Sequence, residues 1–299
     1  MMHSRRLLAW YDRHGRDLPW RKTRDPYRIL VSEIMLQQTQ VSRVLDFYRR
    51  WLKRFPTWRA LASSSNHDVI KAWSGLGYNR RALMLRDIAR HVTTHGVPNT
   101  RDGWLALKGI GPYTADALAV FSLHERRWPI DTNLRRVGGR LLLGKPYPQP
   151  SDDDRVRKLA TYDLRLTKRH FDVPQAAFDL ATSICTKTPK CSICPLRNDC
   201  LAAPKFLSGT VRTPKRMGKK PIEKIHDGKR WPDRIYRGRI LKLVMHARSP
   251  LQIKKLGPLV DHTFDPKVDL PWFRAMLMRM HNDELVKLKK DRVSSMTAS

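Results

Sequence analysis

Four cysteines stand close together in this chain of 299 residues and have the spacing of metal ligands. They are Cys185, Cys191, Cys194 and Cys200, in the pattern C-x5-C-x2-C-x5-C. Scattered structural disulfides do not give such a cluster, and a chain of the reducing cytosol does not need them. Four thiolates this close can enclose one metal centre, either an iron–sulphur cubane or a zinc ion. We therefore expect a metal centre in this segment, with a chance cluster of free thiols as the alternative.

Two carboxylates have surroundings that suit acid–base chemistry. Glu33 lies inside an otherwise apolar helical run, residues 29–36, where burial would raise its pKa and let it keep a proton to donate. Asp131 precedes an apparent helix start, where its side chain can accept a backbone N–H. A solvent-facing helix charge and a simple N-cap are the plainer interpretations.

A glycine-rich turn between two apolar helical segments has the layout of a phosphate clamp. Gly109 and Gly111 interrupt the stretch LKGIGPYTADAL, residues 107–118. Glycine permits positive φ and the near approach of another backbone. A helix that begins just after Gly111 would direct free N–H groups at an anion. The alternative is an ordinary tight turn, but this layout is that of a helix-hairpin-helix.

The elements that must position these residues are helices. Apolar residues recur at three- and four-residue steps from Val41 to Leu52, which predicts an amphipathic helix. Asp25 and Pro26 have the form of an N-cap followed by proline at the first helical position, which opens the helix that carries Glu33. No useful alternating strand pattern occurs before about residue 200. The sequence therefore predicts an all-α catalytic part.

The composition points to a polyanionic partner. The chain has 59 Lys and Arg against 27 Asp and Glu, a net charge of +32, and 41% of its residues are hydrophobic. Such a surface repels itself unless a polyanion is near, and nucleic acid is the leading candidate. An anionic membrane is the rival, but no apolar run is long enough to span one. The first twenty residues lack the apolar core of a signal peptide, so we expect a soluble, cytoplasmic protein.

The last third of the chain differs in composition. Residues 204–233 are rich in Lys, Arg, Pro and Gly without a sustained period, which predicts a basic linker, either a solvated tether or a phosphate contact. From residue 234 two helical patterns follow, the second from Leu270 to Met280. Residues 285–293 then alternate around a Lys-Lys-Asp turn like a hairpin. Residues 234–299 therefore predict a small, basic winged-helix-like domain.

Five motifs in unbroken order resemble a known family. LKGIGPYTA (residues 107–115), IDTNLRRV (residues 130–137) and the cysteine segment resemble the helix-hairpin-helix base-excision DNA glycosylases. VSEIMLQQTQV (residues 31–41) and GLGYNRRA (residues 75–82) resemble its adenine-specific mismatch branch, the MutY family. The resemblance covers residues 3–203. It implies a domain 1–203 of two helical lobes with a cluster loop at 185–200, acting as a monomer on double-stranded DNA with a mismatched or oxidised base pair.

The resemblance also implies roles for individual residues. Glu33 would protonate the adenine ring and handle the water, Asp131 would face the sugar cation, and Asn133 would orient backbone or water nearby. The endonuclease III branch has a lysine at the position of Tyr113, which forms a Schiff base and cuts the strand. Tyr113 cannot do this, so we expect a monofunctional glycosylase that leaves an abasic site. Lys108 would contact phosphate.

Further matching positions would probe the DNA. Gln37, Gln38 and Thr39 match the segment that reads the strand at the lesion, which suits glutamine's base-edge hydrogen bonding, although they could be plain helix surface. Tyr78 matches the wedge beside the opposing base, although alone it could be core. The family's four cysteines hold a [4Fe–4S] cluster. Here the first cysteine gap is five residues instead of six, so zinc stays open as an alternative.

The resemblance stops at the family's C-terminal domain. Typical members carry a Nudix-like domain that helps to recognise 8-oxoguanine, and we expect none after about residue 205. Adenine removal opposite 8-oxoguanine or guanine is the expected activity. Thymine or uracil removal opposite guanine is an alternative, because a related mismatch glycosylase also has tyrosine at the position of Tyr113. A non-catalytic iron–sulphur DNA-binding protein is a further alternative, but it would need neither Glu33 nor Asp131.

Overall fold

The computed structural model describes residues 3–212 and 225–296 and forms two compact units. Among the described residues, the first unit comprises residues 3–33 and 98–212, and the second comprises residues 34–97 and 225–296. Up to residue 212 the helices are α1 (His3–His14), η1 (Pro19–Arg21), α2 (Pro26–Leu36), α3 (Val41–Arg54), α4 (Trp58–Ala62), α5 (Asn66–Trp73), α6 (Arg80–His95), α7 (Arg101–Leu105), α8 (Pro112–Phe121), α9 (Thr132–Leu143), η2 (Pro150–Asp152), α10 (Asp153–Leu164), α11 (Asp172–Ser183), η3 (Cys191–Ile193) and α12 (Ala203–Leu207). No strand occurs among residues 3–212, which confirms the expected all-α catalytic part.

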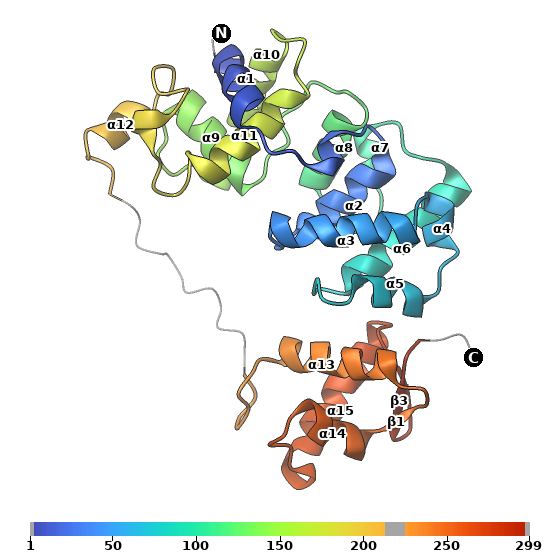
Figure 1. Ribbon diagram of the computed structural model, residues 1–299. Helices are drawn as coiled ribbons and strands as arrows, with labels where there is room; N and C mark the ends of the chain where they lie inside the picture. Colours follow the sequence, from blue (N-terminus) through green and yellow to red (C-terminus); the bar gives the residue numbers. More distant parts are fainter. Residues whose placement is uncertain (1–2, 213–224, 297–299) are drawn as a thin grey trace. The chain divides into compact units, whose positions relative to one another are not determined.

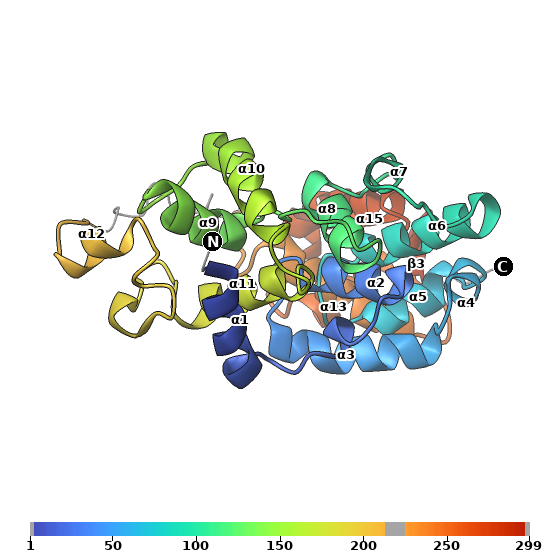
Figure 2. The same ribbon diagram turned by 90° about the horizontal axis from the view of Figure 1, so that it is seen from above.

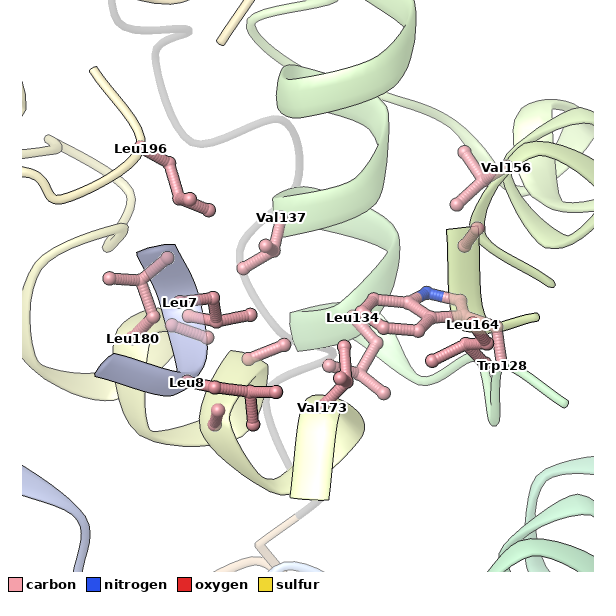
Figure 3. Packing of buried hydrophobic residues seen from close by; sticks show 14 of the residues in the cluster. Leu7, Leu8, Trp128, Leu134, Val137, Val156, Leu164, Val173, Leu180 and Leu196 are labelled. Atoms are coloured by element: carbon pink, nitrogen blue, oxygen red, sulfur yellow. The ribbon is translucent and has the colours of Figure 1, made fainter. Parts of the chain in front are cut away.

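The first unit is built around a core that supports helix α9. Leu134 and Val137 of α9 are buried against apolar side chains from α1, α10 and α11, as Figure 3 shows. Helices α9 and α11 pack together, and α1 lies on α11 in both views of the chain (Figures 1 and 2). Burial of an aliphatic side chain contributes about 1.5–3 kcal/mol, so this packing fixes the helix that begins just after Asp131.

The helical part of the second unit has an aromatic core. Trp51 of α3 lies edge-on to Phe55 and to Trp73 of α5, with ring centroids 4.8 and 5.3 Å apart. Such edge-to-face pairs add about 0.5–1.5 kcal/mol to the burial itself. Helix α6 packs along α4 and α5. Because α6 begins at Arg80, this packing also holds the turn that precedes it.

The C-terminal part combines three helices with a small sheet. Its elements are α13 (Asp233–His246), β1 (Leu251–Gln252), α14 (Ile253–Val260), α15 (Pro266–Asn282), β2 (Lys287–Lys289) and β3 (Arg292–Ser294). The strands are antiparallel in the order β1-β3-β2. The helices pack on one another, and Phe273, Met276 and Val293 are fully buried. Figure 1 shows this part in orange to red.

The expected helices and hairpin of this part are present, but other elements were not expected. Helix α14 and strand β1 have no counterpart in the sequence prediction, because their eight and two residues give too little periodicity. The first residues of the predicted linker lie in helix α12, and its residues 213–224 lie outside the described residues. Within the described residues, none of the helices combines the length and the apolar character that a membrane crossing needs.

Candidate active site

Helix α2 places Glu33 in an apolar environment. The Asp25 carboxylate accepts the backbone N–H of Tyr27 at 2.9 Å, and Pro26 occupies the first helical position, as expected. Along the helix Leu30 and Ile34, on either side of Glu33, are fully buried. The helix therefore takes a carboxyl group out of water, and Glu33 itself is only 9% exposed.

Burial makes Glu33 a group that can hold a proton at neutral pH. It raises the pKa of Glu33 from 4.5 to about 7, mainly because the carboxylate loses its hydration. The negative charge of Asp131 acts in the same direction, whereas a hydrogen bond from Tyr113 opposes the rise in pKa. A pKa near the working pH is what a general acid needs, because both the protonated and the ionised form are then accessible.

Tyr113 lies in the first turn of α8 and donates its hydroxyl to Glu33. Its ring packs edge-on against Phe178, with centroids 6.5 Å apart. Burial and the nearby carboxylates raise the pKa of Tyr113 well above its usual range, so the phenol keeps its proton. The residue at this position is therefore a hydrogen-bond donor to Glu33 and has no amine that could attack a sugar.

Asp131 is the N-cap of helix α9, as the sequence predicts. Its Oδ1 accepts the backbone N–H groups of Asn133 at 2.8 Å and Leu134 at 2.7 Å, and its Oδ2 accepts from the Asn133 side chain at 2.8 Å. Burial raises the pKa of Asp131 above its ordinary value, while these hydrogen bonds and Arg136 work against the rise. The carboxylate is held in one orientation and lies close enough to Glu33 to affect its pKa.

Arg136 connects this carboxylate to the cysteine segment, and the sequence prediction missed it. Its Nη2 donates to Asn133 Oδ1 at 3.0 Å and to the carbonyl of Ala181 at 2.9 Å, and its Nε donates to the carbonyl of Cys185 at 2.8 Å. A continuous set of hydrogen bonds thus runs from Asp131 through Asn133 and Arg136 to Cys185. The only signal in the sequence was an arginine on the α9 face that carries Asn133, one turn away.

The four cysteines are half-buried, and the side chain of Cys185 faces a positive group. The pKa values of Cys191, Cys194 and Cys200 are raised by burial and by the other cysteines of the segment, that of Cys194 to about 12. Arg140, 2% exposed, donates to Cys185 Sγ at 3.4 Å.

This donor set fits a negatively charged thiolate cluster. Arg140 contacts one of the four thiols, that of Cys185, and also donates to the carbonyls of Thr186 and Lys187 in the loop. Hydrogen bonds from such outer groups orient metal ligands. In the positions described for residues 3–212 and 225–296, no three His, Cys, Asp or Glu side chains are arranged to hold a single metal ion.

Two exposed turns of the second unit carry the residues expected to probe DNA. Gln37, Gln38 and Thr39 follow the end of α2, and Tyr78 precedes α6 with 61% of its surface exposed. Gln38 and Tyr78 have positive φ, 55° and 51°, which side chains other than glycine rarely adopt. Because Tyr78 is exposed, it is not a core residue. The strained backbone at Gln38 and Tyr78 must be stabilised by surrounding contacts.

Arg81 provides that support, and the sequence prediction missed this residue too. Its Nη1 donates to the carbonyls of Ile34 at 2.8 Å and Gln37 at 2.5 Å, and its Nη2 donates to the carbonyl of Gly77 at 3.1 Å. The guanidinium also lies over the Tyr78 ring, 5.2 Å from its centroid. One half-buried side chain thus ties both turns together.

The glycine turn between α7 and α8 has the expected form in part. Gly109 has a φ of 93°, which requires glycine, whereas Gly111 is the N-cap of α8 at a φ of −89°. A Cβ at Gly111 would meet nothing within 4 Å, so the space before the helix is open. No side chain caps α8, and its first N–H groups remain available to an anion. Lys108 is exposed beside this opening.

Comparison with known proteins gives the family. Residues 31–161 match the model of the HhH-GPD superfamily base excision DNA repair protein. An adenine DNA glycosylase of Mycolicibacterium smegmatis is 36% identical over 252 residues, which cover 82% of this chain and 81% of the relative. The chain belongs to the adenine DNA glycosylase family. This confirms the resemblance expected from the motifs.

Two further adenine DNA glycosylases match this chain over only part of their own length. The Mycobacterium tuberculosis relative is 43% identical over 197 residues, which cover 64% of this chain and 64% of that protein. The human relative is 37% identical over 210 residues, which cover 66% of this chain and 38% of that protein. The chain thus spans slightly less than two thirds of the Mycobacterium tuberculosis protein.

Solved structures confirm the helix-hairpin-helix glycosylase fold. A thermostable thymine-DNA glycosylase superposes with a TM-score of 0.63 at 27% identity and covers 68% of this chain and 96% of its own. A trapped endonuclease III–DNA covalent intermediate superposes with a TM-score of 0.55 at 18% identity, over 68% of this chain and 95% of its own, which shows a shared fold alone.

Proposed function

We propose that this chain is a monofunctional adenine-specific DNA glycosylase of base excision repair. It removes adenine paired with 8-oxoguanine or guanine from double-stranded DNA and leaves an abasic site. The observation that carries the proposal is the buried Glu33, with a pKa of about 7, in electrostatic contact with a fixed Asp131. The kinship with adenine DNA glycosylases supports adenine as the base that leaves.

In the proposed reaction the two carboxylates act on opposite sides of the N-glycosidic bond. Glu33 acts on the adenine and Asp131 acts on the sugar. Protonated Glu33 donates its proton to a ring nitrogen of adenine, so the base can leave with the electron pair of the N-glycosidic bond. The sugar becomes a cation, and the Asp131 carboxylate stabilises it electrostatically. Ionised Glu33 then takes a proton from the water that adds to the sugar carbon, and Asn133 keeps Asp131 in place.

Tyr113 makes the reaction end at the abasic site. Strand cutting through a Schiff base needs an amine, and a phenol whose pKa is raised above its usual range supplies neither an amine nor a phenolate. Its hydrogen bond to Glu33 instead orients the proton donor. Tyr113 is therefore a positioning residue for the acid.

The same proposal assigns the contacts with DNA. A flipped base must be replaced in the stack, and the exposed Tyr78 suits a wedge beside the opposing base. Gln37, Gln38 and Thr39 offer amide and hydroxyl groups to base edges. Lys108, Gly109 and Gly111 bind a phosphate at the start of α8.

Cys185, Cys191, Cys194 and Cys200 would hold a [4Fe–4S] cluster, the group that such four-cysteine segments bind in related glycosylases. The cluster would order the loop 185–200 and take no part in hydrolysis. Arg140, buried against Cys185, would partly neutralise its negative charge. Zinc is the alternative, and analysis of iron and acid-labile sulphide in the purified protein decides between them.

A panel of duplexes tests the activity. Duplexes with A:8-oxoguanine, A:G, T:G and U:G are incubated with the purified protein, and abasic sites are then cleaved with alkali. We expect cleavage at adenine only, and only after alkali. The structural likeness to a thymine-DNA glycosylase makes T:G the informative competitor. Excision of thymine or uracil but not adenine would refute adenine specificity, and no excision at all would indicate a binding protein.

A further inference from the structure

The β2–β3 hairpin of the C-terminal part presents cations on its exposed side. In the strand register Lys289 lies opposite Arg292, and Lys287 lies opposite Ser294. Leu288 and Val293 form the intervening pair, and Val293 is fully buried, so this pair faces the core. Because successive side chains alternate between faces, Lys287, Lys289 and Arg292 share the other face.

Among the residues that the structure describes, no ion pair compensates the cations of the hairpin. Like charges directly opposite each other in a sheet destabilise it, and Lys289 and Arg292 are such a pair. Across residues 3–212 and 225–296, no carboxylate forms an ion pair with Lys287, Lys289, Lys290 or Arg292. The one acid of the turn, Asp291, is paired with Arg274 of α15. An external polyanion would remove this repulsion.

Two further lysines extend the same surface. The backbone N–H of Ile253, at the start of α14, donates to the carbonyl of Asp291 at 2.8 Å, so the first turn of α14 adjoins the hairpin turn. Lys254 and Lys255 follow in that turn, and both are exposed. We call the resulting group the wing cluster; its members are Lys254, Lys255, Lys287, Lys289, Lys290 and Arg292.

The elements around the wing cluster have the arrangement of a DNA-binding unit. Helices α14 and α15 are joined by five residues, 261–265, like the two helices of a helix-turn-helix, and the basic hairpin follows α15. In such units the second helix enters the major groove while neighbouring elements contact the backbone. Helix α15 keeps Lys267, Arg274 and Met278 exposed along one side.

We propose that the wing cluster is a second DNA-binding surface, which holds the sugar–phosphate backbone of duplex DNA without regard to sequence or damage. This binding goes beyond the proposed base excision, because the wing cluster needs no flipped base to bind DNA. The phosphates of a duplex can pair with this group of largely exposed cations, and neutralisation of the phosphates releases counterions. The surface adds affinity for undamaged duplex to that of the helix-hairpin-helix.

The test compares two double variants of the full-length chain on an undamaged duplex. Lys289→Gln/Lys290→Gln removes two charges from the wing cluster, and Lys242→Gln/Arg248→Gln removes two exposed charges of the same C-terminal part outside it. Fluorescence anisotropy gives Kd at several salt concentrations. We expect the wing variant to bind several-fold more weakly, with a slope of log Kd against log salt lower by about 2, about 1 for each lost phosphate contact.

The control variant should keep the slope of the parent, and Lys289→Arg/Lys290→Arg should restore both affinity and slope. Thermal unfolding of each variant shows that the fold is intact. Equal losses in both double variants, or an unchanged Kd and slope in the wing variant, would overturn the proposal. Because the duplex has no lesion, failure here is distinct from failure to excise adenine.

Discussion

At the scale of the residue, Glu33 shows how an apolar helix raises the pKa of a carboxyl group so that it can donate a proton. The run from Ile29 to Leu36 already predicts a buried carboxyl group, and the structure confirms this, with Glu33 9% exposed. Sequence spacing does not reveal that Tyr113 and Asp131, far away in the chain, adjust its pKa. The burial of Glu33 therefore follows from the local sequence, but the value of its pKa also depends on tertiary contacts.

Replacement of Glu33 should stabilise the protein at alkaline pH. The folded carboxyl has a pKa of about 7 against 4.5 as its ordinary value, so the folded state binds a proton more tightly than the unfolded one. Stability consequently falls as the pH rises through this range, by about 3 kcal/mol in total. We expect Glu33→Gln to unfold at higher urea concentration than the parent at pH 8, and the difference to vanish near pH 4. Equal stability at pH 8 would mean that Glu33 is solvated.

At the scale of the element, turns and helices are held together by arginines that donate to backbone carbonyls. Periodicity predicted α2, α3 and the hairpin β2–β3, because these elements follow from local patterns. Arg81 and Arg136 escaped prediction, because a carbonyl acceptor can come from any residue and leaves no trace in the sequence. Both arginines donate to residues that the sequence analysis named as candidates, Arg81 to Gln37 and Arg136 to Asn133 and Cys185.

Arg81→Lys should loosen both strand-probing turns. Lysine cannot reproduce the fork that binds Ile34, Gln37 and Gly77, so the strained backbone at Gln38 and Tyr78 loses its support. We expect the preference for A:8-oxoguanine duplex over matched duplex to fall at least ten-fold in Kd, or about 1.4 kcal/mol. Arg59→Lys, on the exposed face of α4, is the matched control. An Arg81→Lys variant that keeps the parent's preference for A:8-oxoguanine duplex would show that the hydrogen bonds of Arg81 do not support the two turns.

Arg136→Lys should uncouple Asp131 from the cysteine loop. The substitution keeps the charge but loses the simultaneous bonds to Asn133 and to the carbonyls of Ala181 and Cys185. We expect excision under single-turnover conditions to slow at least ten-fold and the iron content to fall. Arg157 is not equivalent, because it is half-buried and pairs with Asp154 and Asp116. Arg165→Lys, on the surface after α10, is the better control. Unchanged rate and iron content would contradict the coupling.

At the scale of the whole molecule, kinship and composition agree on a nucleic acid partner. The net charge of +32 is spread over both units, and the proposed DNA contacts come from the glycine turn, the two exposed turns and the wing cluster. The all-α character of residues 3–212 and the hairpin near residue 290 followed from the sequence. The sheet order did not, because β1 has only two residues and pairs with a strand some forty residues later.

The measurement that tests the central claim most directly is the pH dependence of adenine excision under single-turnover conditions. With an A:8-oxoguanine duplex between about pH 5 and 9, protonated Glu33 predicts a rate constant that falls ten-fold per pH unit above about 7. Glu33→Gln should lose nearly all activity and this alkaline limb with it. A rate that rises through pH 7, or a Glu33→Gln variant as fast as the parent, would contradict the role of Glu33 as the proton donor.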